Sequence, residues 1–202
     1  MKSDPHESAE SSVSPETVSQ PPLWQRLWKG QSENIRILAI ALIIAVFLRF
    51  VVAEPRFIPS NSMEPTLHVG DRLLVDKLST RLHPPHFGDI VVFEPPPQLQ
   101  EYGYSGKQAF IKRVIATPGE TVTVTNHQVL VDNQALQEPY TLAPPDYLMG
   151  SITVPPGRLF VMGDNRNDSN DSHVWGTLPQ DNVIGIARFR FWPPSRFGQV
   201  SW

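Results

Sequence analysis

One long apolar run constrains how this chain can fold. From Ile37 to Ala53 the sequence reads ILAIALIIAVFLRFVVA, and its single charged residue, Arg49, lies near the far end. At about 1.5 Å per helical residue, such a run covers most of a hydrocarbon core of about 30 Å. Arg49 is close enough to the end of the run to reach the polar interface. The sequence therefore predicts one transmembrane helix over residues 35–53.

Two other interpretations of the run are a buried core helix and a cleaved signal peptide that ends at Ala53. A buried helix should carry polar residues at helical spacing, and this run has none before Arg49. A signal peptide has a short basic region before its apolar segment, whereas residues 1–36 precede this one and include acids. We therefore expect an uncleaved signal anchor.

The residues before the run form two segments. Residues 1–22 are rich in Ser, Glu, Pro and Gln and poor in large apolar side chains, which predicts a disordered cytoplasmic tail. Residues 23–34 mix tryptophan and leucine with basic residues, as is typical of a juxtamembrane segment, and a simple linker is the alternative. These basic residues favour a cytoplasmic N-terminus, although Arg49 and Arg56 weaken the asymmetry. Residues 54–202 would then form an extracytoplasmic domain.

Composition limits what this domain can be. With 202 residues, of which 40% are hydrophobic, the chain can hold one ordinary domain, and its net charge of −3 provides no basic surface for nucleic acid. The absence of cysteine excludes disulfides, cysteine nucleophiles and thiolate metal sites. The 21 prolines against 12 glycines weigh against an all-helical fold, because proline breaks helix interiors.

Short apolar segments bounded by turn residues indicate strands throughout the domain. Because no amphipathic helix lies among them, they predict a mainly β protein with an antiparallel all-β domain, either a sandwich or a partly closed barrel. Residues 128–140, with Asp132 and Asn133 at the turn, are expected to form a hairpin. The expected strands cover residues 71–77, 88–93, 110–115, 122–125, 129–131, 159–162 and 183–191.

The segment from Pro59 to Leu67 reads PSNSMEPTL and follows the apolar run closely. Proline restricts φ and keeps the residue before it out of the helical region, so Ser60 and Ser62 are expected on a stiff, extended or turning segment. Such a segment suits a hydroxyl that must be presented and not buried. The alternative is a polar linker between membrane and domain.

A serine nucleophile needs a base, and Lys112 is a candidate. In the strand expected over 110–115, alternation puts Lys112 on an apolar face with Phe110 and Val114. Lowering a lysine pKa from about 10.4 to about 8 requires roughly 3 kcal/mol, which burial can supply. A neutral amine can then take a serine proton. The alternative is a lysine on an edge strand that reaches water, which the neighbouring Arg113 would allow.

Histidine and metal chemistry have weaker support. None of the histidines lies in a known catalytic motif. The pair His83 and His86 encloses two prolines, which prevent a helical arrangement of metal ligands, and no carboxylate pattern accompanies it. We therefore expect neither a metal nor a cofactor.

The segment from Gly163 to Gly176 reads GDNRNDSNDSHVWG. Side chains of this kind fold a loop by bonding to its own backbone. A calcium-binding loop is the rival, but Ser169 stands where glycine is needed and no glutamate stands at the twelfth position. Two glycosylation sequons, at Asn167 and Asn170, are expected by chance in a run so rich in Asn and Ser. We expect a self-bonded loop that supports a site.

Four blocks of this chain resemble the ordered sequence boxes of bacterial type I signal peptidases: residues 59–67, 70–77, 112–120 and 163–176. By this resemblance, Ser62 is the nucleophile and Lys112 is the general base. Ser60 would add its hydroxyl to the backbone N–H of Ser62 in an oxyanion hole, and Ser169 would orient the lysine.

The resemblance further assigns a supporting role around the site to four residues of the last block, namely Gly163, Asp164, Asn165 and Asp171. The family usually has arginine where this chain has His173. The implied substrates are exported preproteins, cut after small residues at Ala-x-Ala-like sites, and no cofactor is implied. The implied location is a membrane whose catalytic side is the periplasm or the thylakoid lumen. The ending RFWPP, from Arg190 to Pro194, is similar to cyanobacterial and thylakoidal members.

Aromatic residues near the C-terminus could rest on the lipid bilayer, with core packing expected for the first three: Phe189, Phe191, Trp192, Phe197 and Trp202. Two other classes of protein share some of these features. A LexA-like self-cleaving serine–lysine protease shares the dyad, but the expected anchor and the block from Gly163 to Gly176 argue against it, and the sequence indicates no DNA-binding domain. A non-catalytic membrane protein would use the same anchor and β-domain for binding only, and cleavage of a preprotein separates the two cases.

Overall fold

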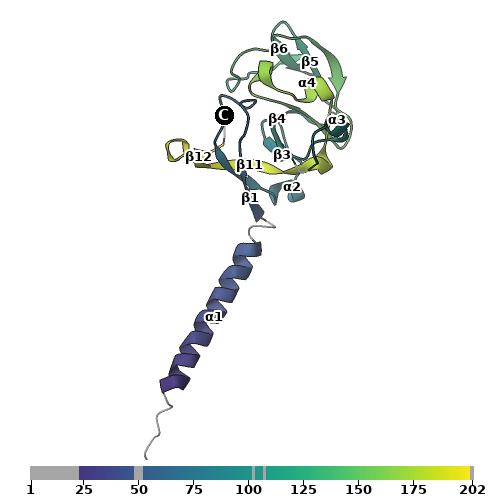
Figure 1. The fold of residues 1–202 in the computed structure, drawn as a ribbon. Helices are drawn as coiled ribbons and strands as arrows, with labels where there is room; N and C mark the ends of the chain where they lie inside the picture. The colour runs from purple at the N-terminus through teal and green to yellow at the C-terminus, as the bar shows by residue number, and fades with distance from the viewer. Residues whose placement is uncertain (1–22, 48–51, 102, 107, 201–202) are drawn as a thin grey trace, which may run out of the picture. The chain divides into compact units, whose positions relative to one another are not determined.

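The computed structural model describes residues 23–47, 52–101, 103–106 and 108–200, and of residues 23–30 and 32 the backbone alone (Figure 1). The chain divides into two units, Met1–Ile44 and Ala45–Trp202. The predicted tail over residues 1–22 lies outside the described residues.

Helix α1, Leu23–Phe47, is continuous, so no break separates the predicted juxtamembrane segment from the apolar run. Within the ranges that the structure describes, no helix has both the length and the apolar character needed to cross a membrane. The predicted boundary at Ala53 is wrong, because Ala53 begins strand β1 and pairs with Asp76 in an antiparallel ladder. Residues 48–51, which belong to the same prediction, lie outside the described part of the chain.

The second unit consists of short strands joined by turns and single helical turns. Its strands are β1 (Ala53–Phe57), β2 (Arg72–Asp76), β3 (Ile90–Phe93), β4 (Phe110–Ala116), β5 (Thr121–Thr125), β6 (Gln128–Val131), β7 (Gln134–Ala135), β8 (Met149–Thr153), β9 (Arg158–Met162), β10 (Leu178–Pro179), β11 (Val183–Trp192) and β12 (Gly198–Gln199). Its helical turns are α2 (Ser79–Leu82), α3 (Pro97–Glu101), η2 (Arg166–Asp168), α4 (Ser172–Trp175), η3 (Gln180–Asn182) and η4 (Pro194–Arg196).

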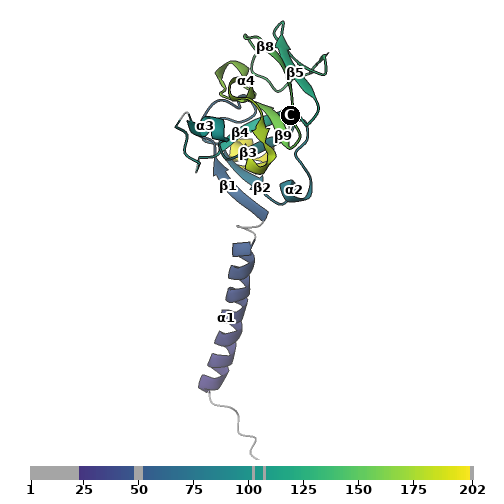
Figure 2. The same cartoon turned by 90° about the vertical axis from the view of Figure 1, so that its right-hand side faces the viewer.

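Two antiparallel sheets form this unit. The larger sheet runs in the order β1-β2-β11-β3-β4-β9-β10, with β12 paired to β11, and the smaller runs in the order β7-β6-β5-β8. The smaller sheet lies at the opposite end of the unit from β1 and β2 (Figures 1 and 2). The mainly antiparallel β fold predicted from the sequence is confirmed, and β4 occupies the interior of the larger sheet.

The predicted hairpin is present between β6 and β7, where Val131 pairs with Gln134. Asp132 and Asn133 turn the chain with φ of 49° and 64°. Both residue types tolerate positive φ, as a two-residue hairpin turn requires. Turn chemistry was therefore sufficient to predict this element.

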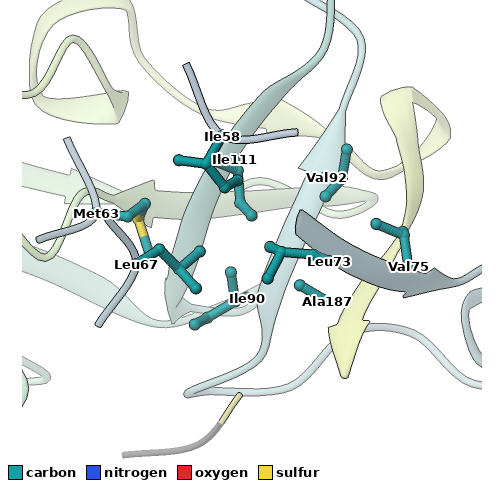
Figure 3. Close-up of a cluster of buried hydrophobic side chains, with 9 residues drawn as sticks. All are labelled: Ile58, Met63, Leu67, Leu73, Val75, Ile90, Val92, Ile111 and Ala187. Atoms are coloured by element: carbon teal, nitrogen blue, oxygen red, sulfur yellow. The ribbon is translucent and has the colours of Figure 1, made fainter. Parts of the chain in front are cut away.

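Among the described residues, three clusters of buried apolar side chains make up the core of the β unit. One of them joins the larger sheet to the loop after β1 (Figure 3) and consists of Ile58, Met63, Leu67, Leu73, Val75, Ile90, Val92, Ile111 and Ala187. Another fills the space around β5, β6 and β9 and includes Val122, Val124, Val129 and Phe160. The third packs on the opposite side of β3 and β11 around Phe93, Leu159 and Trp175.

Candidate active site

The serine segment is anchored in the core. Met63 and Leu67 are completely buried and contribute to the same cluster as Leu73 and Ile90 of the sheet (Figure 3). Full burial of such a side chain contributes about 1.5–3 kcal/mol, so two of them fix the segment to the domain. The polar-linker interpretation is therefore wrong. Ser62, directly before Met63, is 7% exposed and has a defined position.

Lys112 lies on an interior strand and not on an edge. It is 3% exposed on β4, between β3 and β9, which excludes the alternative of a lysine that reaches water from an edge strand. Its Nζ donates a hydrogen bond of 2.7 Å to Ser62 Oγ. Among the described residues this is the one hydrogen bond of the Lys112 amine. The two residues with the predicted roles are therefore in direct contact.

Burial lowers the pKa of Lys112 to about 8, because removing the amine from water disfavours its charged form. The carboxylates of Asp171 and Asp164 oppose this shift but are outweighed by the desolvation. A lysine with this pKa is neutral in a useful fraction of molecules near neutral pH, and a neutral amine can accept a proton.

Ser60 is close to the same hydroxyl. Its Oγ lies 3.4 Å from Ser62 Oγ, and either oxygen can be the donor. The hydroxyl of Ser60 and the backbone N–H of Ser62 are thus available on adjacent parts of one short segment. This arrangement is compatible with the predicted oxyanion hole.

Asp171 organises the polar loop. It is completely buried, and its Oδ2 accepts hydrogen bonds from the backbone N–H of Gly163 at 2.8 Å and from Ser169 Oγ at 2.6 Å. It also caps α4 by accepting from the backbone N–H of His173. Ser169 and Lys112, both described, form no hydrogen bond with each other.

Gly163 brings the loop against the serine segment. A Cβ at this position would overlap the Ser62 carbonyl oxygen and the Ser169 hydroxyl and would lie 2.6 Å from Ser169 Cβ. The same carbonyl accepts from the backbone N–H of Asn165 at 3.1 Å. Glycine is needed here for close approach, and Ser169 is thereby held next to Ser62.

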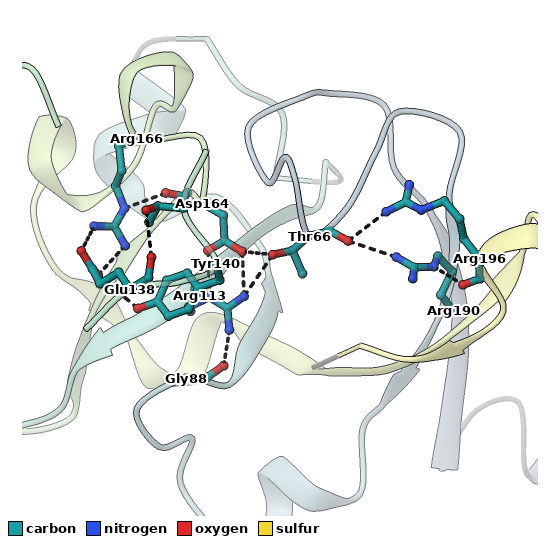
Figure 4. Close-up of polar contacts among 11 residues, drawn as sticks. Thr66, Gly88, Arg113, Glu138, Tyr140, Asp164, Arg166, Arg190 and Arg196 are labelled. Carbon is teal, nitrogen blue, oxygen red and sulfur yellow. Dashed lines mark hydrogen bonds and ion pairs between the residues drawn. The ribbon is translucent and has the colours of Figure 1, made fainter. Parts of the chain in front are cut away.

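Asp164 forms an ion pair with Arg113 (Figure 4). Both side chains are completely buried, and Arg113 binds the carboxylate through Nε at 2.8 Å and Nη2 at 2.7 Å. Thr66 Oγ1 also donates to Asp164, at 2.5 Å, and the Thr66 carbonyl accepts from Arg190 and Arg196 (Figure 4). Asp164 therefore ties β4, the serine segment and the polar loop together.

Sequence reasoning missed the arginines of this network. In the sequence, Arg113 stands out only as a neighbour that would let Lys112 reach water, although strand alternation puts Arg113 on the opposite face of β4. Arg166 is buried and binds Glu138 through two hydrogen bonds of 2.7 Å each (Figure 4). No local pattern around Glu138 indicated this contact.

His173 occupies the position where the resembled family has arginine. Its Nδ1 lies 2.7 Å from Asp171 Oδ1, and its ring stacks on Tyr147 with a centroid distance of 4.2 Å. The imidazole therefore contacts the carboxylate that organises the loop, so the change of residue type preserves a polar partner for Asp171.

An open cleft of about 500 Å³ lies beside the serine and the lysine. Ser60, Ser62 and Lys112 line one side, and apolar residues of the β3–β4 region, including Ala109 and Ile111, line another. Ser62 and Lys112 therefore border a space that is open to solvent. In the described part of the chain, no group of three or more His, Cys, Asp or Glu side chains is arranged to hold a metal ion.

A mainly antiparallel β domain that presents a serine hydrogen-bonded to a buried lysine at an open cleft has the features of a serine peptidase. The comparison with protein families is specific. Residues 31–192 match the family model "Signal peptidase, peptidase S26", and the chain belongs to this family.

Relatives from photosynthetic organisms are similar over most of this chain. It is 61% identical over 173 residues to a probable signal peptidase I-1 of Synechocystis sp., a match that covers 86% of this chain and 88% of the relative. It is 45% identical over 169 residues to a probable thylakoidal processing peptidase 2, chloroplastic, of Arabidopsis thaliana, covering 84% of this chain and 46% of the relative. A crystal structure of a signal peptidase I from Enterococcus faecalis is 28% identical, with a TM-score of 0.41, and covers 52% of this chain and 97% of its own.

Proposed function

We propose that this chain is a membrane-anchored endopeptidase that removes N-terminal signal peptides from exported preproteins, cutting after small residues at Ala-x-Ala-like sites. The observation that carries the proposal is the 2.7 Å hydrogen bond from the buried amine of Lys112 to the hydroxyl of Ser62. Membership of the signal peptidase family and the relatives named above support the same substrate class.

The reaction begins when neutral Lys112 takes the proton of Ser62 Oγ as the oxygen attacks the scissile carbonyl. The Ser62 N–H and the Ser60 hydroxyl hold the negative charge that develops on the carbonyl oxygen. The protonated lysine then gives its proton to the leaving amine, and an acyl-enzyme remains on Ser62. Water, deprotonated by the same lysine, hydrolyses this ester and restores both groups.

The proposed location follows from the apolar run. The apolar run that precedes β1 anchors the chain, the N-terminus is cytoplasmic, and the domain from Ala53 onward lies outside the cytoplasm, in the periplasm or the thylakoid lumen. From Ala53 to Ser62 the chain reaches at most roughly 30 Å, at about 3.3 Å per residue. A cut close to the membrane surface, where a signal peptide emerges, is therefore within range.

A second part of the proposal is lipid contact by aromatic residues of β11 and the turn after it. Phe191, Trp192 and Phe197 are 36%, 49% and 65% exposed, so core packing, which was expected for the first two, is wrong for them. Phe189 is half-buried and packs edge-on against Phe197. Trp202 lies outside the described residues.

Because the chain has no cysteine, a single introduced cysteine can carry a fluorophore that reports lipid contact. Phe197→Cys, labelled and reconstituted in liposomes with a quencher on the lipid, should be quenched. The matched control is Leu148→Cys, which is 81% exposed and directly precedes the small sheet. Equal quenching at the two positions would contradict lipid contact at Phe197.

The main proposal is tested with full-length protein in detergent and a preprotein that carries an Ala-x-Ala site. Ser62→Ala and Lys112→Ala should each abolish cleavage, and Ser60→Ala should lower kcat by about 10²-fold with little change in KM. The controls are Ser151→Ala, an exposed serine of the small sheet, and Lys77→Ala, which pairs with Glu54. Retained cleavage by either Ser62→Ala or Lys112→Ala would refute the dyad. If the wild-type protein leaves the preprotein uncut, a non-catalytic binding protein would be favoured instead.

A further inference from the structure

A side-chain contact joins the serine segment to the polar loop at the cleft. Asn61, which stands between Ser60 and Ser62, donates from Nδ2 to Asp168 Oδ2 at 2.7 Å. The direction of this bond follows from the chemistry, because an ionised carboxylate only accepts hydrogen bonds. We call this contact the Asn61–Asp168 bridge. The mechanism described above makes no use of it.

Other hydrogen bonds from the same turn act on the same short segment. Asn165 donates its backbone N–H to the Ser62 carbonyl at 3.1 Å and its Nδ2 to the Asn61 carbonyl at 3.4 Å. Asp168 in turn donates its backbone N–H to the Asn165 carbonyl at 3.1 Å. One turn of the polar loop therefore holds the side chain of Asn61 and the two carbonyl groups around it.

The two groups that would bind the oxyanion flank Asn61: the N–H of the peptide between Asn61 and Ser62, and the side-chain hydroxyl of Ser60. A rotation at Asn61 moves the Ser62 N–H and the Ser60 hydroxyl relative to each other. Donors of this kind contribute only within about 2.7–3.1 Å of the oxyanion, and a displacement of about 1 Å can cost a large factor in rate. Asn61 and Asp168, whose hydrogen bond is exposed, also line the same cleft as Ser62 and Lys112.

We propose that Asp168 is a positioning residue, which acts through its hydrogen bond to Asn61 and sets the geometry of the oxyanion hole. This inference rests on the proposed roles of Ser60 and Ser62. Asp168 does not touch the reacting atoms, and its effect is expected on kcat and not on KM.

The test exchanges donor and acceptor across the bridge. Asn61→Asp places two carboxylates face to face and should lower kcat about tenfold or more, with KM changed less than about twofold. The double variant Asn61→Asp with Asp168→Asn restores a hydrogen bond of reversed direction, and kcat should recover to within about threefold of wild type. Asp168→Asn alone keeps an acceptor oxygen and should lose less activity than Asp168→Ala.

Asn167→Ala is the matched control for general loosening of the loop. Asn167 lies in the same turn, but its side chain bonds to the Pro144 carbonyl and to the backbone N–H of Asp146, away from the serines. The thermal midpoint of every variant is measured beside its kinetics. If Asn167→Ala and Asn61→Asp both lose kcat in proportion to the fall in their thermal midpoints, the positioning role of Asp168 would be overturned.

Other results also decide the matter. Unchanged kcat in Asn61→Asp, failure of the double variant to recover, or a rise in KM at constant kcat would each overturn the inference. Ser62→Ala is measured in the same assay to distinguish failure of the proposed function from failure of the proposed role of Asp168. If Ser62→Ala retains cleavage, the proposed nucleophile fails; if it abolishes cleavage while the exchange has no effect, only the role of Asp168 fails.

Discussion

Gly163 approaches the carbonyl oxygen of Ser62 so closely that no side chain can be placed between them. The contact joins the loop that follows β9 to the segment that follows β1. Asp171 holds it from the loop side, by accepting the Gly163 N–H at 2.8 Å. The position of the Ser62 hydroxyl thus depends on a residue that carries no chemistry of its own.

Gly163→Ala is expected to lower kcat/KM by at least about 10²-fold, because the new methyl group must displace Ser62 or Ser169. It should also reduce the free energy of unfolding by about 1–3 kcal/mol. Gly150→Ala is the control, since a Cβ there meets nothing within 4 Å. Peptide cleavage and urea denaturation measure the two effects, and near-wild-type activity in Gly163→Ala would show that the site tolerates displacement of the serine segment.

Lys112→Met should stabilise the fold at neutral pH while it abolishes cleavage. The folded pKa of about 8 lies below the ordinary 10.5, so the unfolded state binds more protons between these values and stability rises with pH through this window. Below pH 8 the buried amine costs roughly 3 kcal/mol, which methionine removes.

The gain from Lys112→Met should therefore be largest below pH 8 and should shrink toward pH 10.5. Urea denaturation in detergent at pH 7 and pH 10 measures it, with Lys77→Met as the control. A larger gain at pH 10 than at pH 7 would contradict the assignment of the buried amine as the cause.

The pH–rate profile of wild type should report the same group. Because the neutral amine is the base, kcat/KM should rise about tenfold per pH unit below pH 8 and level off above it. Asp171→Asn removes a charge that raises the pKa of Lys112, so its midpoint should move to lower pH. A midpoint near 6.5 in wild type would instead implicate a histidine.

Replacing only one partner of the ion pair between Arg113 and Asp164 should strongly destabilise the fold. Arg113→Met leaves a buried carboxylate without its bidentate partner and is expected to destabilise the fold by about 3–5 kcal/mol. The double variant Arg113→Met with Asp164→Leu removes both charges and should be less destabilised than Arg113→Met alone. Additive losses in denaturation experiments would show that the pair is not coupled.

Local sequence pattern predicted the structure well where a single segment is sufficient to form the element. Strand alternation put Lys112 on the apolar face of β4 but left open whether it reaches water, whereas the pair Asp132–Asn133 predicted a hairpin turn that the structure confirms. Local sequence pattern gave the wrong interpretation where tertiary packing determines the structure of a segment. The segment around Ser62 looks like a polar linker by composition, yet Met63 and Leu67 are completely buried, because only the folded sheet offers the cluster that receives them.

The sequence by itself determined the antiparallel β class, which follows from local spacing and turn residues, and its resemblance to a known family indicated the residues of the candidate site and their order along the chain. Only the tertiary structure decided which of them meet. Ser62 and Lys112 are 50 positions apart, and Asn61 and Asp168 are 107 apart. Such contacts depend on strand register and on the close approach at Gly163, and neither is encoded in any single stretch of the chain.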